Sequence, residues 1–402
     1  MKKIGIICEY NPFHSGHAYQ LEQIRLRDED TAIVCLMSGH AVQRGELAMA
    51  DRYTRAAMAL SCGADAVLEL PYPFCAASAA YFAGAGVALL DALGMDELSF
   101  GSECADPARL ECVAAITQTS EFIARVSERQ RRGEGSAQAY FAELQDSLDG
   151  DAERLAANDI LGVSYIRAIR AIDSGMHPMP LRRDGSAYSA LGTESGKHPS
   201  ATALRALIGE GNINEALRFL PDMAEKELQK AIANGLAPVD LSRLDLAILT
   251  FFRLQDPRQL EQFAEMQGGL AYRLHDAALC ADSLEGMLSL AASKNYPTAR
   301  LRRAVLFAMT GVTAQDLMTP PTYLTLLAAN AKGRALLRQW KDTSPIPIVT
   351  KPANTPTDSD AALRQAALSS ALDRLFSLAL PTPHRADTFI KMSPCVRDTK
   401  QE

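Results

Sequence analysis

Two histidines three residues apart, His14 and His17, are the residues whose type and spacing best suit chemistry. They lie in EYNPFHSGHAYQL, between IGIIC, an apolar run typical of a strand, and AYQLEQIR, which has helical spacing. We therefore expect them in the turn that opens a helix, where backbone N–H groups and the helix dipole favour an anion. Two imidazole donors on one side of that turn would stabilise charge on an α-phosphate during in-line attack. Gly16 would let the phosphate approach the backbone.

The elements that would hold these histidines repeat along the first half of the chain. Short apolar runs (IGIIC, TAIVCLM, AVLEL, ELSFG) alternate with segments of helical spacing. This alternation is typical of a parallel sheet with right-handed crossovers. In such α/β folds the loops after the strands carry the ligands. The position after the first strand therefore favours a site over two ordinary surface histidines.

The second half of the chain has a different pattern. From about residue 216 helical spacing dominates, and no series of strands is evident. We therefore predict an N-terminal α/β domain with a parallel sheet over residues 1–215. A mostly α-helical domain would follow over residues 216–402, and its last residues have no clear pattern. The length of 402 residues, more than one comfortable hydrophobic core, agrees with two domains.

Composition limits the class of protein. No apolar run approaches the roughly 18 residues that span a membrane, and the N-terminus lacks the apolar segment of a signal peptide. We therefore expect a cytoplasmic protein that does not bind a membrane. The eight cysteines form no CxxC pair and are best interpreted as buried small hydrophobic residues rather than zinc ligands. No metal site built from protein ligands is predicted.

Charge is distributed unevenly along the chain. The net charge of −7 argues mildly against a nucleic-acid partner. Residues 290–351, however, carry nine Lys or Arg against two acidic residues. A basic segment on an acidic chain can bind phosphates, although charge alone favours a set of solvated helix faces.

Two motifs resemble those of a known superfamily. HSGH at 14–17 resembles the HxGH motif of the nucleotidyltransferases, and SATALR at 200–205 resembles their second motif, a Ser/Thr-rich turn with an arginine at a helix start. Hydroxyls at the helix N-terminus and an arginine one turn later would hold the β- and γ-phosphates of ATP. Alone, SATALR would be an N-cap and a surface arginine. Its position after HxGH makes it a second part of a nucleotide site.

Further motifs narrow the resemblance to one family. MSG, QRGE, ELP, FGSE and NDILG, with KNYPTARLRR in the second half, are similar to motifs of the bacterial tRNA(Met) cytidine acetate ligases over about residues 1–351. The resemblance implies a Rossmann-like domain and a two-step reaction. Acetate would attack the α-phosphate of ATP to give acetyl-adenylate and pyrophosphate. The N4 amine of the wobble cytidine of elongator tRNA(Met) would then take the acetyl group. Mg²⁺ is implied as well, held mainly by the nucleotide phosphates.

The resemblance also assigns the residues of the ATP site. His14, His17 and Arg205 would be catalytic. The loop from residue 7 to residue 20 would cradle the nucleotide, together with residues that follow later strands. The residues expected to bind ATP are Ile7, Glu9, Asn11, Pro12, Phe13, Gly16, Gln20, Gly101, Asn158, Arg183, Ser200 and Thr202.

The basic segment would bind the tRNA. A single-stranded anticodon loop needs phosphate contacts and aromatic side chains on which bases stack. Tyr296 is a candidate for stacking, and Trp340, the only tryptophan, suits stacking or the core equally. The residues expected to contact tRNA are Lys294, Arg300, Arg302, Arg303, Arg338 and Lys341.

Simpler explanations stay open for single residues and for the function. Gly101 could be only a turn and Asn158 only a helix cap, and Arg44 is a further candidate for a substrate or tRNA contact. An adenylyltransferase for a small cofactor precursor is the alternative enzyme, but it leaves the basic segment unexplained. A nucleotide-binding regulatory protein without catalysis is a third interpretation. The intact HxGH motif argues against it, because a sensor needs no transition-state donors.

Overall fold

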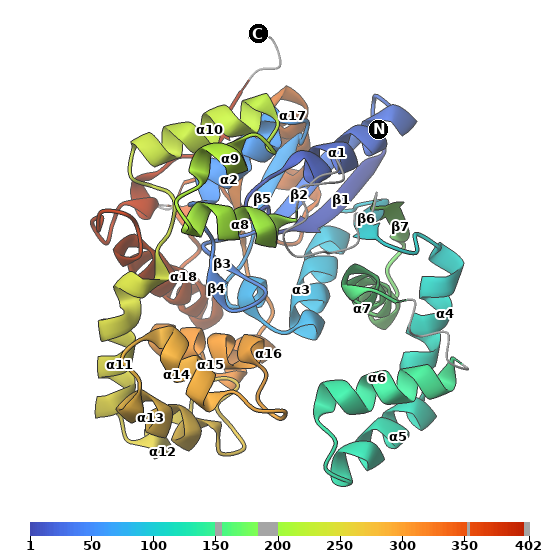
Figure 1. Ribbon diagram of the computed structural model, residues 1–402. Coiled ribbons are helices and arrows are strands. Elements are labelled where there is room, and N and C mark those ends of the chain that lie inside the picture. Colours follow the sequence, from blue (N-terminus) through green and yellow to red (C-terminus); the bar gives the residue numbers. More distant parts are fainter. Residues whose placement is uncertain (149–154, 184–199, 352–353, 398–402) are drawn as a thin grey trace.

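A central sheet organises the chain, which is described here by a computed structural model (Figure 1). The structure describes all residues except 149–154, 184–199, 352–353 and 398–402, so the loop expected after the strand near residue 180 falls outside the described residues. In the described part, eight strands form the sheet in the order β10-β8-β5-β2-β1-β6-β7, with β9 beside β8, and β3 and β4 form a separate hairpin. The strands are β1 (Lys3–Cys8), β2 (Ala32–Ser38), β3 (Ala41–Val42), β4 (Glu46–Leu47), β5 (Ala66–Leu70), β6 (Glu97–Ser102), β7 (His177–Arg182), β8 (Leu324–Ala329), β9 (Ile348–Val349) and β10 (Cys395–Val396).

The central sheet is buried on both faces. All of β2 is buried, and its side chains alternate between two hydrophobic clusters. Ile33 and Cys35 pack with helices α1 (Ser15–Arg27) and α2 (Arg52–Ser61). Val34 and Leu36 belong to the other cluster, with residues of α3 (Ala79–Ala92) and α7 (Ala157–Ala171). Helices on both faces of mostly parallel strands confirm the predicted α/β fold.

The helices begin at residues that can cap them. Asp51 accepts hydrogen bonds from the backbone N–H groups of Tyr53 (2.9 Å) and Thr54 (3.0 Å) at the start of α2. The other helices of the first half are α3 (Ala79–Ala92), α4 (Pro107–Thr117), α5 (Ser120–Arg131), α6 (Ser136–Ser147), α7 (Ala157–Ala171) and α8 (Ala201–Gly209). Those of the second half are α9 (Ile213–Leu217), α10 (Asp222–Ala233), α11 (Asp245–Leu254), α12 (Pro257–Leu260), α13 (Leu270–Cys280), α14 (Leu284–Ala291), α15 (Thr298–Thr310), α16 (Ala314–Met318), α17 (Ala331–Thr343) and α18 (Asp360–Leu378).

The direction in which strands are added reverses beside β1. The chain passes from β1 to β2 and β5 on one side, and then crosses to β6 on the other side of β1. Strand β1 pairs in parallel with both of its neighbours. In open parallel sheets, ligands bind in the crevice at the carboxyl ends of the two strands that flank such a reversal. By this rule a ligand would bind between the start of α1, which carries the two histidines, and the loop after β6.

The C-terminal quarter of the chain returns to the sheet. The expectation of helices without strands after residue 216 is wrong at β8, which pairs antiparallel with β5, and at β9 and β10, which pair with β8. The sequence of β8, LTLLAA, is apolar throughout, and periodicity cannot distinguish such a run from a buried helix segment. The division at residue 216 stays a prediction, but the central sheet takes strands from both halves.

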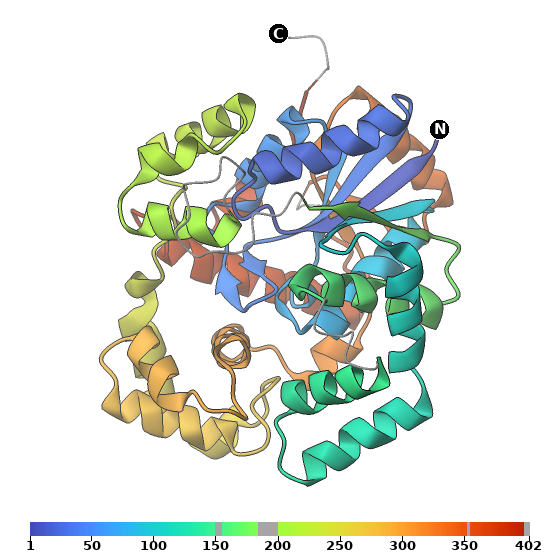
Figure 2. The same cartoon turned by 45° about the vertical axis from the view of Figure 1, so that its right-hand side comes forward.

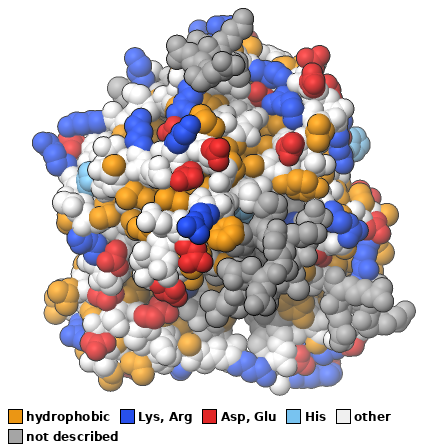
Figure 3. All heavy atoms as spheres, turned by 45° about the horizontal axis from the view of Figure 1, so that its top comes forward, with side chains coloured by type: hydrophobic (Ala, Val, Ile, Leu, Met, Phe, Trp, Pro, Cys, Tyr) orange, Lys and Arg blue, Asp and Glu red, His pale blue; other side chains and the backbone are white. Residues whose placement is uncertain are grey.

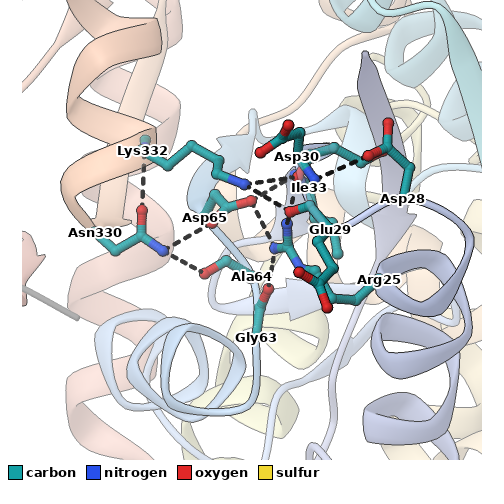
Figure 4. Close-up of polar contacts among 12 residues, drawn as sticks. Arg25, Asp28, Glu29, Asp30, Ile33, Gly63, Ala64, Asp65, Asn330 and Lys332 are labelled. Carbon is teal, nitrogen blue, oxygen red and sulfur yellow. Dashed lines mark hydrogen bonds and ion pairs between the residues drawn. The ribbon is translucent and has the colours of Figure 1, made fainter. Parts of the chain in front are cut away.

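A polar cluster at the amino ends of the strands fastens this returning segment (Figure 4). The buried carboxylate of Asp65 accepts hydrogen bonds from Arg25 Nη2, from the backbone N–H of Ile33 and from Asn330 Nδ2, each at 2.8 Å. Asn330 is the N-cap of α17. A Cβ at Gly333 would lie 2.0 Å from the carbonyl oxygen of Asp65, so the start of α17 touches the turn before β5 directly.

A buried ionic network joins α18 to the loop after β2. Both carboxylate oxygens of Asp373 accept hydrogen bonds from Arg52, at 2.7 and 3.0 Å, and His40 Nδ1 lies 2.8 Å from one of them. Arg52 also pairs with Glu69 at 3.3 Å. Burial, with the charge of Arg52, lowers the pKa of His40 to about 4. Burial opposes ionisation of Asp373, but Arg52 and His40 outweigh it and lower its pKa to about 2. The network therefore contains a neutral imidazole and an ionised carboxylate at neutral pH.

Two groups of helices extend away from the sheet. Figures 1 and 2 show α4 to α6 on one side and α11 to α16 on the other. The two groups meet at a backbone contact, because a Cβ at Gly135 would lie 3.2 Å from the carbonyl oxygen of Lys294. Within the described residues, no helix is both long and apolar enough to span a membrane.

Candidate active site

The two histidines form a stacked pair at the start of α1. His14 is the N-cap of α1, and the ring centroids of His14 and His17 are 3.8 Å apart with an interplanar angle of 29°. The backbone N–H of Gly16 donates to His14 Nδ1 (3.0 Å), and the backbone N–H of His14 donates to His17 Nδ1 (3.3 Å). Because both Nδ1 atoms accept, the neutral rings carry their protons on Nε2. The two rings lie on the same side of the turn, and their role as donors to a phosphate stays a prediction.

The protonation state of the pair follows from its surroundings. Burial lowers the pKa of His17 well below its usual value, and the proximity of His14 and of the Arg183 guanidinium lowers it further. His17 is therefore neutral at neutral pH and acts as an N–H donor rather than as a cation. Gly16 has a structural role here, since a Cβ at this position would lie 2.9 Å from Cε1 of His14. The glycine makes room for the imidazole that caps the helix.

Three apolar residues among those expected to bind ATP are buried. Ile7, Pro12 and Phe13 have almost no exposed surface. The ring of Phe13 lies 5.5 Å from that of His17, and Tyr10 lies 4.8 Å from it on another side. Tyr10 and Phe13 therefore hold the imidazole of His17 in place.

The second motif lies against the first. Arg205 donates to the backbone carbonyl of Asn11 (2.8 Å), and its other terminal nitrogen lies 3.4 Å from Thr202 Oγ1. Ser200 is the N-cap of α8, and its hydroxyl accepts from the backbone N–H of Ala203 (3.2 Å). Ser200 therefore caps α8 while Arg205, in the same motif, reaches the histidine loop. A capping role for SATALR does not exclude the expected role in phosphate binding.

Polar side chains of the loop after β1 also hold the loop after β2. Glu9 Oε1 accepts from the backbone N–H of Gln43 (2.9 Å), and Asn11 Oδ1 accepts from that of Met49 (2.8 Å). Burial raises the pKa of Glu9. Arg55, which sequence analysis missed, is fully buried and donates to the carbonyl of Glu9 (2.6 Å) and to the last carbonyl of β2 (3.0 Å). Glu9 and Asn11 thus position the loops, whatever contact they make with a nucleotide.

On the side of β6 and β7 lie two predicted residues, Gly101 and Arg183, and Gln20 reaches this side from α1. Gly101 lies inside β6 rather than in a turn. A Cβ there would lie 3.1 Å from Cγ and Cδ of Arg183, which follows β7. Gln20, on α1, donates to Ser99 Oγ on β6 (3.2 Å). The glycine therefore makes room for the arginine, whose charge reaches His17.

Asn158 is not the cap of its helix. Ala156 is the N-cap of α7, and Asp159 accepts from its backbone N–H (3.0 Å). The amide of Asn158 instead donates from Nδ2 to Oε1 of Glu103, in the loop after β6, at 2.5 Å. The structure therefore places Asn158 beside the same crevice, on the side of β6.

Arginines of the first basic cluster, on α15, are paired within the chain. Arg303 forms two hydrogen bonds with Glu265, at 2.6 and 2.8 Å, and only 14% of its side chain is exposed. Arg302 pairs with Glu46 and, at 3.2 Å, with Glu285. Sequence analysis treats these guanidiniums as available to RNA phosphates, because it registers their charge and not their partners. A contact with tRNA stays a prediction for both.

The same arginines mark a contact between the two halves of the chain. Gly45, at the tip of the β3–β4 hairpin, has a φ of +75°, and a Cβ there would lie 2.4 Å from the backbone nitrogen of Arg303. The hairpin follows β2, so α15 lies at the carboxyl edge of the sheet, where the histidines are. Arg300 lies 5.3 Å from the ring centroid of Tyr296, and Lys294 is exposed at the Gly135 contact.

The second basic cluster, on α17, lies elsewhere. Arg338 and Lys341 are exposed. Trp340 between them is buried and donates to the carbonyl of Leu93 (2.9 Å), in the turn before β6. That turn is at the amino edge of the sheet, opposite the histidines, so Trp340 belongs to the core. Figure 1 shows α17 at the top of the molecule and α15 in its lower half. Basic and acidic side chains are interspersed on the face that Figure 3 shows.

A cavity of about 660 Å³ lies between the two halves. Its walls come from the β3–β4 hairpin, α8, the start of α11 and α15. Arg205 and Arg302 both line it, as do Gly209, Asp245 and several aliphatic side chains. The cavity therefore connects the predicted catalytic arginine with a predicted tRNA-binding arginine.

Metal ligands do not gather in this site. Over the part of the chain that the structure describes, no three His, Cys, Asp or Glu side chains stand together as a metal site would need. The donors around the histidines are instead imidazole, guanidinium and backbone N–H groups. These groups suit the phosphates of a nucleotide.

Comparison with known proteins agrees with this geometry. The model of the HIGH Nucleotidyl Transferase family matches residues 1–387. The tRNA(Met) cytidine acetate ligase of Syntrophotalea carbinolica is 35% identical over 360 residues, 87% of this chain and 85% of the relative. That of Halothermothrix orenii is 33% identical over 369 residues, 87% of both chains. The crystal structure of Thermotoga maritima TmcAL bound with alpha-thio ATP matches with a TM-score of 0.91 and 30% identity, covering 99% of this chain and all of that one.

Proposed function

Since this chain belongs to the HIGH nucleotidyltransferase family, and within it to the tRNA(Met) cytidine acetate ligases, we propose that it activates acetate with ATP and transfers the acetyl group to tRNA. Membership of this family sets aside the cofactor adenylyltransferase and the inactive regulatory protein. The observation that carries the proposal is the stacked His14–His17 pair, with its protons on Nε2, at the crevice between β1 and β6.

The first step is acetyl-adenylate formation. A carboxylate oxygen of acetate attacks the α-phosphorus of ATP, the bond to the β-phosphate oxygen breaks, and pyrophosphate leaves. His14 and His17 donate hydrogen bonds to the oxygens on which charge accumulates. Arg205, fixed against the carbonyl of Asn11, neutralises the leaving pyrophosphate. Mg²⁺ is held mainly by the phosphates in this proposal, and the imidazole, guanidinium and backbone N–H groups described around the histidines suit those phosphates.

The second step is acetyl transfer. The N4 amine of the wobble cytidine of elongator tRNA(Met) attacks the acetyl carbonyl carbon, AMP leaves, and the amine loses a proton. We place the entry of the acceptor nucleotide in the cavity between Arg205 and Arg302. Its position supports this, since one wall is the arginine that contacts the histidine loop and another is the basic helix α15.

The cavity can be filled from Gly209 without replacing a residue of the ATP site. Gly209 lines it at the last position of α8, and a Cβ built there has no described atom within 4 Å. Gly209→Phe is expected to lower tRNA acetylation about tenfold or more, because the acceptor can no longer be positioned. Acetate-dependent ATP–pyrophosphate exchange should stay within about twofold of that of the unmodified protein. Gly209→Ala is the matched control and should keep both activities. Unchanged acetylation by Gly209→Phe would place the acceptor elsewhere.

One experiment tests the proposed function as a whole. The protein is incubated with ATP, Mg²⁺, isotopically labelled acetate and unmodified elongator tRNA(Met), and the nucleosides are analysed by mass spectrometry. We expect labelled N4-acetylcytidine, and none when ATP is omitted. Pyrophosphate release without label in the tRNA would show that the histidine site activates acetate for another acceptor, and would overturn the second step alone.

A further inference from the structure

The loop after β6 contains a hydrogen-bond acceptor that the proposed site does not use. Glu103 follows the last residue of β6, at the crevice where the strand order reverses. Its Oε1 accepts from Asn158 Nδ2 at 2.5 Å. Its Oε2 is shielded from solvent and has no hydrogen-bond partner among the described residues. A buried carboxylate oxygen without a donor is unfavourable, so a ligand that supplies a donor is stabilised there.

The turn that carries Glu103 is held firmly. The buried carboxylate of Asp159, on α7, accepts at Oδ1 from the hydroxyl of Ser102 (2.5 Å) and from the backbone N–H groups of Glu103 (3.0 Å) and Cys104 (3.2 Å). The Glu103 backbone therefore needs no rearrangement when a ligand binds. A fixed acceptor of this kind improves affinity and selectivity, because little ordering is required.

We propose that Glu103 determines the nucleotide specificity of the ATP site by accepting, at Oε2, a hydrogen bond from the nucleoside half of ATP. This rests on the proposed function. The phosphates are unsuitable partners, because a carboxylate repels them and their donors are His14, His17 and Arg205. The nucleoside half carries neutral donors, the 6-amino group of adenine and the ribose hydroxyls, and a carboxylate accepts from either.

The hydrogen bond between Asn158 and Glu103 determines how a glutamine at position 103 would be oriented. In Glu103→Gln the new amide would turn its oxygen toward Nδ2 of Asn158, as Oε1 is now. The amide nitrogen would then stand where Oε2 is, so an acceptor is replaced by a donor of almost the same size. A ligand donor would face another donor, while the packing of the turn is retained.

The experiment measures nucleotide binding alone. Isothermal titration calorimetry of the full chain with Mg²⁺, but without acetate or tRNA, gives the dissociation constants of ATP, ITP, 2′-deoxy-ATP and 3′-deoxy-ATP. Glu103→Gln is compared with the unmodified protein and with Glu97→Gln, a control at the opposite end of β6, where Glu97 pairs with Lys2 at 2.6 Å. Thermal unfolding without nucleotide shows whether each variant is folded. If Glu103→Gln is not, Glu103→Ala is measured in its place.

We expect Glu103→Gln to bind ATP about tenfold or more weakly and to lose one discrimination that the unmodified protein shows. Loss of the preference for ATP over ITP identifies the 6-amino group. Loss of the preference over a deoxy analogue identifies a ribose hydroxyl. Equal loss of affinity for all four nucleotides, or no loss, would overturn the inference. Failure of the unmodified protein to bind ATP would instead overturn the proposed function.

Discussion

Replacing His17 with alanine is expected to lower acetate-dependent ATP–pyrophosphate exchange by about 10²- to 10³-fold, as expected for removal of one transition-state hydrogen-bond donor. The imidazole is neutral, carries its proton on Nε2 and is held by Tyr10 and Phe13, so it donates without reorganising. The affinity for ATP should change much less than the rate, since the donor acts mainly on charge that develops in the transition state.

His14 requires a different substitution, because it also caps α1. Alanine would remove the acceptor for the N–H of Gly16 and cost about 1 kcal/mol of helix stability. Asparagine is a favourable N-cap but does not place an N–H donor where the imidazole Nε2 lies. His14→Asn is therefore expected to keep the unfolding temperature and to lower the exchange rate as His17→Ala does.

A histidine outside the site provides the control for both variants. His177 is exposed at the start of β7, and His177→Ala should leave exchange unchanged. Exchange by His17→Ala within threefold of the unmodified protein would show that the pair does not carry the chemistry.

The second large effect concerns stability rather than catalysis. Asp373→Asn is expected to lower the free energy of unfolding by about 3–5 kcal/mol, because Arg52 then stays buried and, among the described residues, keeps Glu69 alone as an acidic partner. Urea unfolding at neutral pH measures the change as a lower midpoint at unchanged slope. The effect should fade as the pH falls from about 4 to about 2, because the Asp373 carboxylate, whose pKa the fold lowers to about 2, is then protonated and no longer pairs with Arg52 as a charge.

Two further variants show whether the buried charge is responsible. Asp360, exposed in the first turn of the same helix, gives the control Asp360→Asn, which should cost less than about 1 kcal/mol. Combining Asp373→Leu with Arg52→Met removes both charges and should cost less than the sum of the two single substitutions. An additive result would mean that Arg52 and Asp373 do not interact energetically.

Local patterns were sufficient to predict the histidine site. The strand, the turn and the helix of residues 3–27 follow from apolar runs and spacing within a short window, and the HxGH motif lies inside it. Arg205 was expected in the site of the histidine loop because two motifs were recognised as parts of one site, and the structure brings it to the carbonyl of Asn11, 194 positions away. Neither residue alone indicates the contact.

The features that sequence analysis missed depend on partners far along the chain. His40 and Asp373 are 333 positions apart, and nothing near either residue indicates the other. The Gly45 hairpin meets α15 through backbone contacts, which leave no charge or hydrophobic pattern. Glu103 belongs to a recognised motif, but its open acceptor is visible only when the partners of each oxygen are known.

The return of β8 to the sheet affects how the chain can be made. During translation the histidine loop emerges from the ribosome early. Strand β5 can pair with β2, but its other edge has no partner until residues 324–329, which form β8, have emerged. Through most of synthesis the nascent chain therefore exposes an unpaired strand edge, which is prone to pair with other chains. We expect chaperones to bind this edge in the nascent chain. A polypeptide released before β8 would contain the catalytic motifs and still be a substrate for proteolysis.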